Sequence, residues 1–192
     1  MSTEFHRHFS RHQQAVSDSI VALESAAELA GEALVAALGA GHKVLTFGNG
    51  GSSAEASHLA EELVGRFRKT RRPFPAISLS ADSATVTCIS NDFGYDAVFE
   101  RQIEAFAQPG DVAVALTTSG KSENVLRALR LARQRGVVTI ALTGAAGLSG
   151  AEADHVLAVP STDGALVQEV HLMLIHVWCS AVDKALGGDA RE

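Results

Sequence analysis

The first forty residues place an apolar side chain at nearly every third or fourth position. This stripe consists of Val16, Ile20, Leu23, Ala27, Ala30, Leu34 and Leu38. Such spacing predicts an amphipathic helix over residues 3–39 that ends at Gly39 and Gly41. The pattern leaves open one helix or two, divided at residues 17–19. A helix this long cannot bury its stripe on a small sheet alone, so we expect residues 1–40 to pack against another subunit.

Beyond residue 40 the pattern changes to short apolar runs that alternate with amphipathic segments. Strands are predicted at residues 43–49, 74–80, 111–119, 137–144 and 154–160, and helices at 52–67, 95–107, 123–136 and 165–186. Residues 83–90 have the β-branched composition of a strand but the spacing of a short helix, and we favour the helix. Strands that alternate with helices of about 10–15 residues predict parallel pairing with right-handed crossovers. The expected fold is α/β with one five-stranded, doubly wound parallel sheet in a single domain, residues 1–192, whose α/β core is 41–192.

Composition excludes several classes of protein. Apolar residues make up 46% of the chain, which is typical of a globular protein, and the net charge of −6 argues against a nucleic-acid partner. The polar start MSTEFHRHFSRH has no signal-peptide core, and no membrane span is expected. We therefore expect a cytoplasmic protein.

Cysteine and histidine residues outside the motifs receive structural interpretations. Cys88 and Cys179 are read as buried thiols in a reducing compartment. His6, His8 and His12 are read as a solvated helix start, because no carboxylate or cysteine is patterned with them.

Two glycine- and hydroxyl-rich turns follow two of the predicted strands. The first, GNGGSS (48–53), contains Ser52 and precedes a helix whose free N–H groups suit an anion. The second, TTSGKSENV (117–125), gathers Thr117, Thr118, Ser119 and Ser122 before another helix start. Each turn alone is explained as a capped helix start. Because ligands bind beyond the carboxyl ends of parallel strands, the two together predict a phosphate site.

Two helical motifs carry candidate acid–base or metal-binding groups. In SHLAEEL, His58 and Glu62 lie four residues apart on one face, which suits two ligands of one metal or a coupled acid–base pair, whereas Glu61 points about 100° away and is read as solvated. A simple surface contact between His58 and Glu62 is the alternative. In QEVHLMLIH, Gln168 and His176 share a broad face. The pattern alone does not choose between His171 and His176.

Together these residues resemble the sugar isomerase (SIS) domain family, and within it the phosphoheptose isomerases. GNGGSS, HLAEELVGRF, RPFPAISL, SNDFG, TTSGKS and QEVHLMLIH fall in that family's order over nearly the whole chain. The resemblance implies a three-layer α/β sandwich, a homotetramer with sites at subunit interfaces, and a phosphorylated sugar as substrate. One departure, Lys121 in the second turn, adds a positive charge near the expected phosphate.

The resemblance also implies roles for single residues. Phosphate or substrate-hydroxyl contacts are expected from Ser52, Thr118, Ser119 and Ser122. Further substrate contacts are expected from Asn49, Gly50, Gly51, Asn91, Asp92 and Arg66. The implied zinc ligands, for one ion per subunit, are His58, Glu62, Gln168 and His176, and the implied acid–base pair is Glu62 and His176.

The expected activity is conversion of sedoheptulose 7-phosphate to D-glycero-D-manno-heptose 7-phosphate, the entry to heptose synthesis for surface polysaccharide. A carboxylate suits proton removal beside a carbonyl, and an imidazole suits proton transfer between the oxygens. The alternative is a non-catalytic SIS module that binds the replication initiator or senses sugar phosphates. Glu62 and His176 favour the enzyme, because the initiator-binding relatives lack both.

Overall fold

The computed structural model describes residues 2–148, 150 and 152–187. Residues 1, 149, 151 and 188–192 of the expected domain lie outside it. The sheet consists of β1 (Val44–Gly48), β2 (Ala76–Ser78), β3 (Val112–Thr117), β4 (Val138–Thr143) and β5 (His155–Ala158). All its pairs are parallel, in the order β2-β1-β3-β4-β5. The helices are α1 (Ser2–Gly39), α2 (Gly51–Val64), α3 (Ser83–Phe93), α4 (Val98–Phe106), α5 (Glu123–Gln134) and α6 (Gly164–Leu186), with a 3₁₀ turn η1 (Tyr95–Ala97) before α4.

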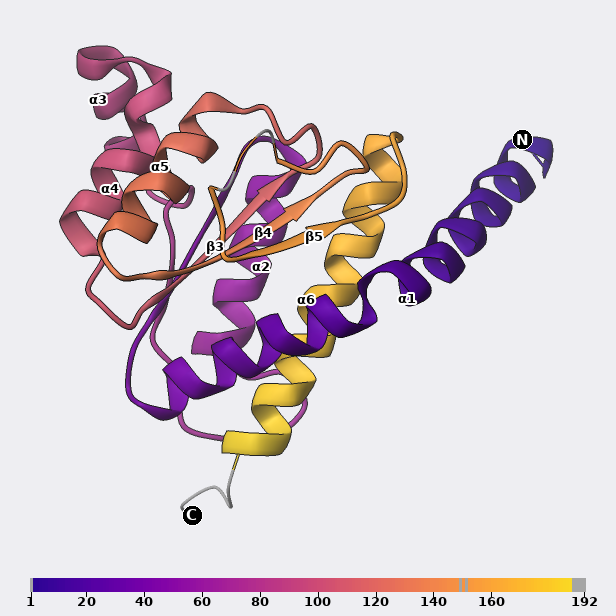
Figure 1. The fold of residues 1–192 in the computed structure, drawn as a ribbon, viewed down its shortest axis with the longest axis horizontal. Coiled ribbons are helices and arrows are strands. Elements are labelled where there is room, and N and C mark those ends of the chain that lie inside the picture. The colour runs from indigo at the N-terminus through magenta and orange to yellow at the C-terminus, as the bar shows by residue number, and fades with distance from the viewer. Residues whose placement is uncertain (1, 149, 151, 188–192) are drawn as a thin grey trace.

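The sheet separates two hydrophobic cores, so the expected three-layer α/β sandwich is confirmed (Figure 1). Alternate side chains of β1 and β3 enter opposite cores, which is why both strands are buried along their whole length. One core joins α1, α2 and α6 to the sheet, and the other joins α3, α4 and α5.

The N-terminal helix is continuous. Ser19, in the segment where a break was possible, lies inside α1, and its hydroxyl donates to the carbonyl of Ala15 at 2.7 Å. The helix ends at Gly39, and Gly41 follows with φ of 88°. Its first turns project beyond the sheet (Figure 1), and their side chains reach the start of α6. The long N-terminal helix is therefore confirmed as one element.

The structure also decides or shortens other predicted elements. The ambiguous segment is the helix α3, whose cap Asp82 accepts hydrogen bonds from the Ala84 and Thr85 N–H groups. Side-chain and backbone hydrogen bonds from Thr85 lead the causes that lower the pKa of Asp82. The second strand is shorter than predicted, three residues instead of seven, because it pairs only with β1 at the sheet edge.

Three side-chain interpretations were wrong. Cys88 is exposed on α3, whereas Cys179 is buried as expected. His8 and His12 are not simply solvated, because each ring lies within 2.7 Å of a carboxylate oxygen of Glu169. That carboxylate comes from α6, some 160 residues away along the chain, so no local pattern could reveal it.

The expectation about membrane-length segments needs a correction. Helix α6 is long and apolar enough to cross a membrane by length and composition. The core helix of a soluble protein passes the same test, and α6 places Trp178, Ile175 and Val182 inside the hydrophobic core. Its apolar length is explained by contacts with both α1 and α2, which fits a soluble domain.

A buried ion pair joins the end of α2 to the end of α6. The Arg71 guanidinium donates to Asp183 at 2.8 Å and to the carbonyls of Glu62 and Leu63 at 2.7 and 2.9 Å. Asp183 also accepts from the N–H groups of the loop after α2, at Arg68 and Lys69. Burial acts to raise the pKa of Asp183, but these hydrogen bonds outweigh it and hold the pKa below the ordinary value.

Replacing Asp183 by alanine should destabilise the fold by about 3–5 kcal/mol, because a buried guanidinium and two backbone N–H groups lose their acceptor. Urea unfolding at pH 7 measures the loss. Because the folded pKa is lowered, the stabilisation is present at neutral pH and disappears as the pH falls through that pKa. The exposed Asp18→Ala control should stay within about 0.5 kcal/mol of the parent. Equal stabilities for the two variants at pH 7 would contradict this role for the clamp.

Candidate active site

The two predicted anion-binding turns lie side by side at the carboxyl edge of the sheet. In the β1–β3 ladder Gly48 is paired with Leu116, so both strands end at the same level. A Cβ atom at Gly48 would lie 2.8 Å from the Leu116 carbonyl oxygen, which explains why glycine ends β1. Gly50 follows with φ of 56°, and α2 begins at Gly51. The first turn therefore presents the N-terminus of α2 beside the second turn.

The second turn concentrates hydroxyl groups before α5. The Thr117 and Ser122 hydroxyls are 3.3 Å apart, and the Ser119 hydroxyl accepts from the Lys121 N–H at 3.2 Å. Ser122 occupies the N-cap position but makes no side-chain cap bond. The Ser122 side chain therefore does not accept a hydrogen bond from the first N–H groups of α5. Hydroxyls and free N–H donors in one turn can surround an anion.

Asn49 is held by two residues that the sequence analysis did not select. Its side-chain amide exchanges two hydrogen bonds of 2.9 Å with buried Asn124, and its Oδ1 also accepts from the Tyr95 hydroxyl at 2.8 Å. Asn124 lies in the first turn of α5, so this pair ties the two turns together. The available sequence signal for Asn124 was an amide side chain in the first turn of a predicted helix. The contact of Tyr95 with Asn49 is long-range, so no local signal pointed to it.

A second cluster lies further along α2 and α6. His58 Nε2 is 3.3 Å from a Glu62 oxygen, and one ligand atom from each of His58, Glu62 and His176 falls within 4.8 Å of the other two. The His58 and His176 rings meet edge to face at 5.3 Å, and Phe67 stacks on His176 at 5.5 Å. Two imidazoles and a carboxylate are a donor set that zinc accepts. The cluster could hold a divalent metal.

Gln168 reaches the turn at the start of α2. Its Nε2 lies 3.5 Å from the Ser52 hydroxyl, and a Cβ atom added to Gly51 would fall 2.4 Å from the same nitrogen. Ser52 itself is buried. The side chain of Gln168 therefore packs directly over the first turn of α2, where any side chain at position 51 would force the Gln168 amide to move.

Arg66, Asn91 and Asp92 are less closely tied to the other predicted site residues. Arg66 lines a hollow of about 630 Å³ together with Glu62 and Phe67. Asn91 and Asp92 are exposed at the end of α3, and the Asn91 amide donates to Asp92 at 2.7 Å. Within the described part of the chain, neither makes a hydrogen bond to a predicted site residue outside this pair.

The structure separates the two histidines that the pattern left open. His176 belongs to the cluster with His58 and Glu62. His171 is fully buried and meets the Thr143 carbonyl at 3.2 Å and the Glu55 carboxylate at 4.0 Å. Burial raises the pKa of Glu55 to about 8 and lowers that of His171 to about 4. Glu55 was missed because its partner lies on another helix.

Comparisons with known proteins agree with this architecture. The sequence model of the SIS domain matches residues 7–144. The phosphoheptose isomerase of Bradyrhizobium sp. (strain ORS 278) is 46% identical, over 96% of this chain and 94% of that protein. The enzyme of the same name from Aquifex aeolicus is 51% identical, over 79% of this chain and 80% of its own length.

Solved structures of the same group superpose closely. The phosphoheptose isomerase of Francisella tularensis gives a TM-score of 0.89 at 35% identity, covering 95% of this chain and 97% of that one. The phosphoheptose isomerase of Neisseria gonorrhoeae gives 0.87 at 35% identity, covering 95% and 98%. On this match of sequence, length and fold, the chain belongs to the phosphoheptose isomerase family of SIS-domain proteins.

Proposed function

We propose that this protein converts sedoheptulose 7-phosphate to D-glycero-D-manno-heptose 7-phosphate in the cytoplasm, as the first step of heptose precursor synthesis. The observation that carries the proposal is the meeting of Glu62, His58 and His176 on the two helices that flank the turn 48–53. A non-catalytic module needs no carboxylate and imidazole in contact. The names and similarity of the relatives support the enzyme in the same direction.

The phosphate is assigned to the two hydroxyl-rich turns. Ser52, Thr118, Ser119 and Ser122, together with the first N–H groups of α2 and α5, supply neutral donors for its oxygens. Thr117 supports this turn through its contact with Ser122. Lys121, exposed in the same turn, adds a positive charge. The sugar hydroxyls are assigned to Asn49, Gly50, Gly51, Gln168, Arg66, Asn91 and Asp92.

The isomerisation is assigned to Glu62 and His176. The Glu62 carboxylate takes a proton from C1 of the ketose, which leaves an enediolate, and returns it to C2 to form the aldose. The imidazole of His176 moves a proton from the oxygen on C1 to the oxygen on C2. Phe67 holds the face of that ring by stacking on it, so its orientation is fixed before substrate arrives.

A zinc ion is assigned to His58, Glu62, Gln168 and His176, one per subunit. The mutual separations of the two histidines and the glutamate fit a single small cation. The Gln168 amide lies over the first turn of α2 in this structure, so it would have to turn towards the cluster to add its oxygen. Bound zinc would supply positive charge to an oxygen of the substrate. Because Glu62 is assigned to both roles, its carboxylate must keep one oxygen free for the proton.

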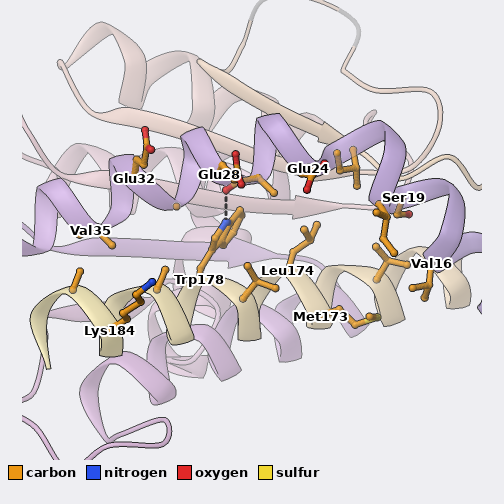
Figure 2. A pocket seen from close by; sticks show the side chains of 18 of the residues that line it. Val16, Ser19, Glu24, Glu28, Glu32, Val35, Met173, Leu174, Trp178 and Lys184 are labelled. Carbon is orange, nitrogen blue, oxygen red and sulfur yellow. Dashed lines mark hydrogen bonds between the residues drawn. The ribbon is translucent and has the colours of Figure 1, made fainter.

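A homotetramer is assigned from an apolar groove between α1 and α6. The groove has a volume of about 1040 Å³, and its lining includes Ile20 and Val177. Trp178 lies between the two helices (Figure 2). The Trp178 indole joins the two helices at the bottom of the groove, where its N–H donates to the Ala27 carbonyl at 2.9 Å. The side chains of Ile20 and Val177 remain 61% and 57% exposed and line the same groove, and a contiguous exposed apolar surface is typical of an interaction site. A second copy of the chain would cover this surface.

The length of α2 supports placing the site between subunits. Ser52 and Glu62 are ten residues apart on α2, which separates their Cα atoms by about 15 Å along the axis. A seven-carbon sugar phosphate bridges this span only in an extended form. A neighbouring copy that covers the groove could contribute groups that close the distance.

Replacing Glu62 or His176 by glutamine should lower kcat by at least about 10²–10⁴-fold, because each change removes a proton-transfer group. Turnover of sedoheptulose 7-phosphate to the aldose measures the loss, and calorimetry should show that both variants still bind the substrate. Glu104→Gln, exposed on α4, serves as the matched control with parental turnover. Parental activity in either site variant would eliminate the assigned pair.

Purified protein should contain one zinc ion per chain by elemental analysis. His58→Ala should weaken zinc binding by more than the about 10–100-fold that changes outside the ligand set cost. Competition with a chromophoric chelator measures this affinity without any assay of turnover. Unchanged affinity in the His58→Ala protein would remove His58 from the ligand set.

Val177→Glu should shift the molecular mass in solution from four chains towards fewer, because the new carboxylate would be desolvated in the interface. Light scattering coupled to gel filtration measures the mass. Val64→Glu, an exposed apolar residue at the end of α2 and outside the groove, should leave the assembly intact. A tetramer that persists in the Val177→Glu protein would move the interface elsewhere.

A further inference from the structure

Glu55 and His171 form a buried contact that the assigned chemistry does not use. Glu55 extends from α2 towards α6, and its Oε2 lies 4.0 Å from Nδ1 of His171. Both atoms are shielded from solvent, and neither has a hydrogen-bond partner in the described part of the chain. Buried polar atoms are rarely left unpaired in native proteins, so two that face each other call for an explanation.

The contact at the opposite edge of the His171 ring shows which ring nitrogen carries a hydrogen. Nε2 of His171 lies 3.2 Å from the carbonyl oxygen of Thr143 at the end of β4. A carbonyl oxygen only accepts hydrogen bonds, so Nε2 must be the donor. If the ring is neutral, Nδ1 therefore presents a lone pair to Glu55. An ionised Glu55 would then place one acceptor against another.

One proton is shared by the contact, and it can be placed in two ways. The proton can sit on Glu55 beside a neutral ring, or on His171 as a buried ion pair. Across 4.0 Å neither state has a direct hydrogen bond, and the ion pair would in addition leave two desolvated charges, which is the costlier arrangement. Burial raises the pKa of Glu55 and lowers that of His171, and both directions favour the neutral arrangement near pH 7.

The contact lies between the two parts of the candidate active site. On α2, Glu55 precedes His58 by three residues and Glu62 by seven, so the three share one side of the helix. On α6, His171 lies between Gln168 and His176. The pair therefore joins α2 and α6 midway between the turn that Gln168 covers and the cluster at Glu62.

We propose that Glu55 is a protonated carboxylic acid that closes the 4.0 Å gap to donate its hydrogen to Nδ1 of neutral His171, and that this neutral pair positions α2 against α6 so that His58 and Glu62 meet His176. The pair acts through the helices and does not touch the substrate. Its catalytic consequence rests on the proposed isomerase function, whereas its protonation state does not.

Glu55→Gln and Glu55→Ala separate this role from the alternatives. The glutamine amide can donate to Nδ1 as the acid does, so kcat and zinc affinity should stay within about twofold of the parent. Alanine removes the donor, and both should fall by about 10–100-fold, as for other groups that orient metal ligands. KM should change little, because the two anion-binding turns are untouched.

Spectroscopy of the full-length parent protein tests the proton directly. Nitrogen NMR at pH 7 should show His171, assigned by its loss in His171→Leu, with hydrogen on Nε2 alone. The infrared spectrum should contain a protonated carboxylic-acid band that disappears in Glu55→Gln. Hydrogen on both ring nitrogens would overturn the proposal, and so would a glutamine variant as impaired in zinc affinity as the alanine variant.

The two proposals fail in distinguishable ways. If sedoheptulose 7-phosphate is not converted, the isomerase assignment falls, while the His171 spectrum and the zinc titrations still judge the pair. If turnover is normal but His171 is doubly protonated, only the pair is wrong. If Glu55→Ala keeps parental zinc affinity and kcat, the pair has no positioning role.

Discussion

The close packing of α2 against α6 is the constraint on which the candidate site depends. Both helices lie on the same face of the sheet, and residues from both form a row of contacts along their interface. Gly51 accommodates the Gln168 amide at one end, and the His58 and His176 rings meet further along. A shift of one helix along the other by a single residue would break all of these contacts together.

The far end of this helix pair is fixed by charge. Arg71 binds two carbonyls at the C-terminus of α2 and the Asp183 carboxylate of α6. Replacing such a pair by apolar residues is often neutral or stabilising, so its value need not lie in stability alone. Its geometry is specific: the guanidinium donates to the carbonyls of both Glu62 and Leu63 while it binds Asp183. In this protein the ion pair therefore fixes the backbone of Glu62, the residue assigned as base.

Much of the fold was readable because its signals are local. Buried strands such as β1 and β3 appear as apolar runs, and glycines follow where the backbone must turn or approach a neighbour. Parallel pairing in one doubly wound sheet followed from the alternation of strand and helix, whereas the three layers were implied by the family resemblance. The same locality explains the continuous α1, since a serine inside a helix can satisfy its hydroxyl on the preceding turn.

The readings that failed, or were never made, depend on contacts between distant segments. Glu169 comes to His8 and His12 across the fold, and Glu55 comes to His171 from another helix. Periodicity indicates which face of a helix is buried, but it does not indicate which polar group of another segment that face will contact. The cluster at Glu62 was located by family resemblance, whereas its i, i+4 spacing alone also described a surface contact.

The turn after β3 has one further consequence, which arises from its contact with the loop after β4. A Cβ atom on Gly120 would lie 1.8 Å from the Gly147 carbonyl oxygen, and the Gly144 N–H donates to the Thr118 carbonyl at 3.1 Å. The two loops are therefore in direct backbone contact. Any side chain at Gly120 would therefore displace the loop after β4 as well as the turn that carries it, because the two segments touch through their backbones.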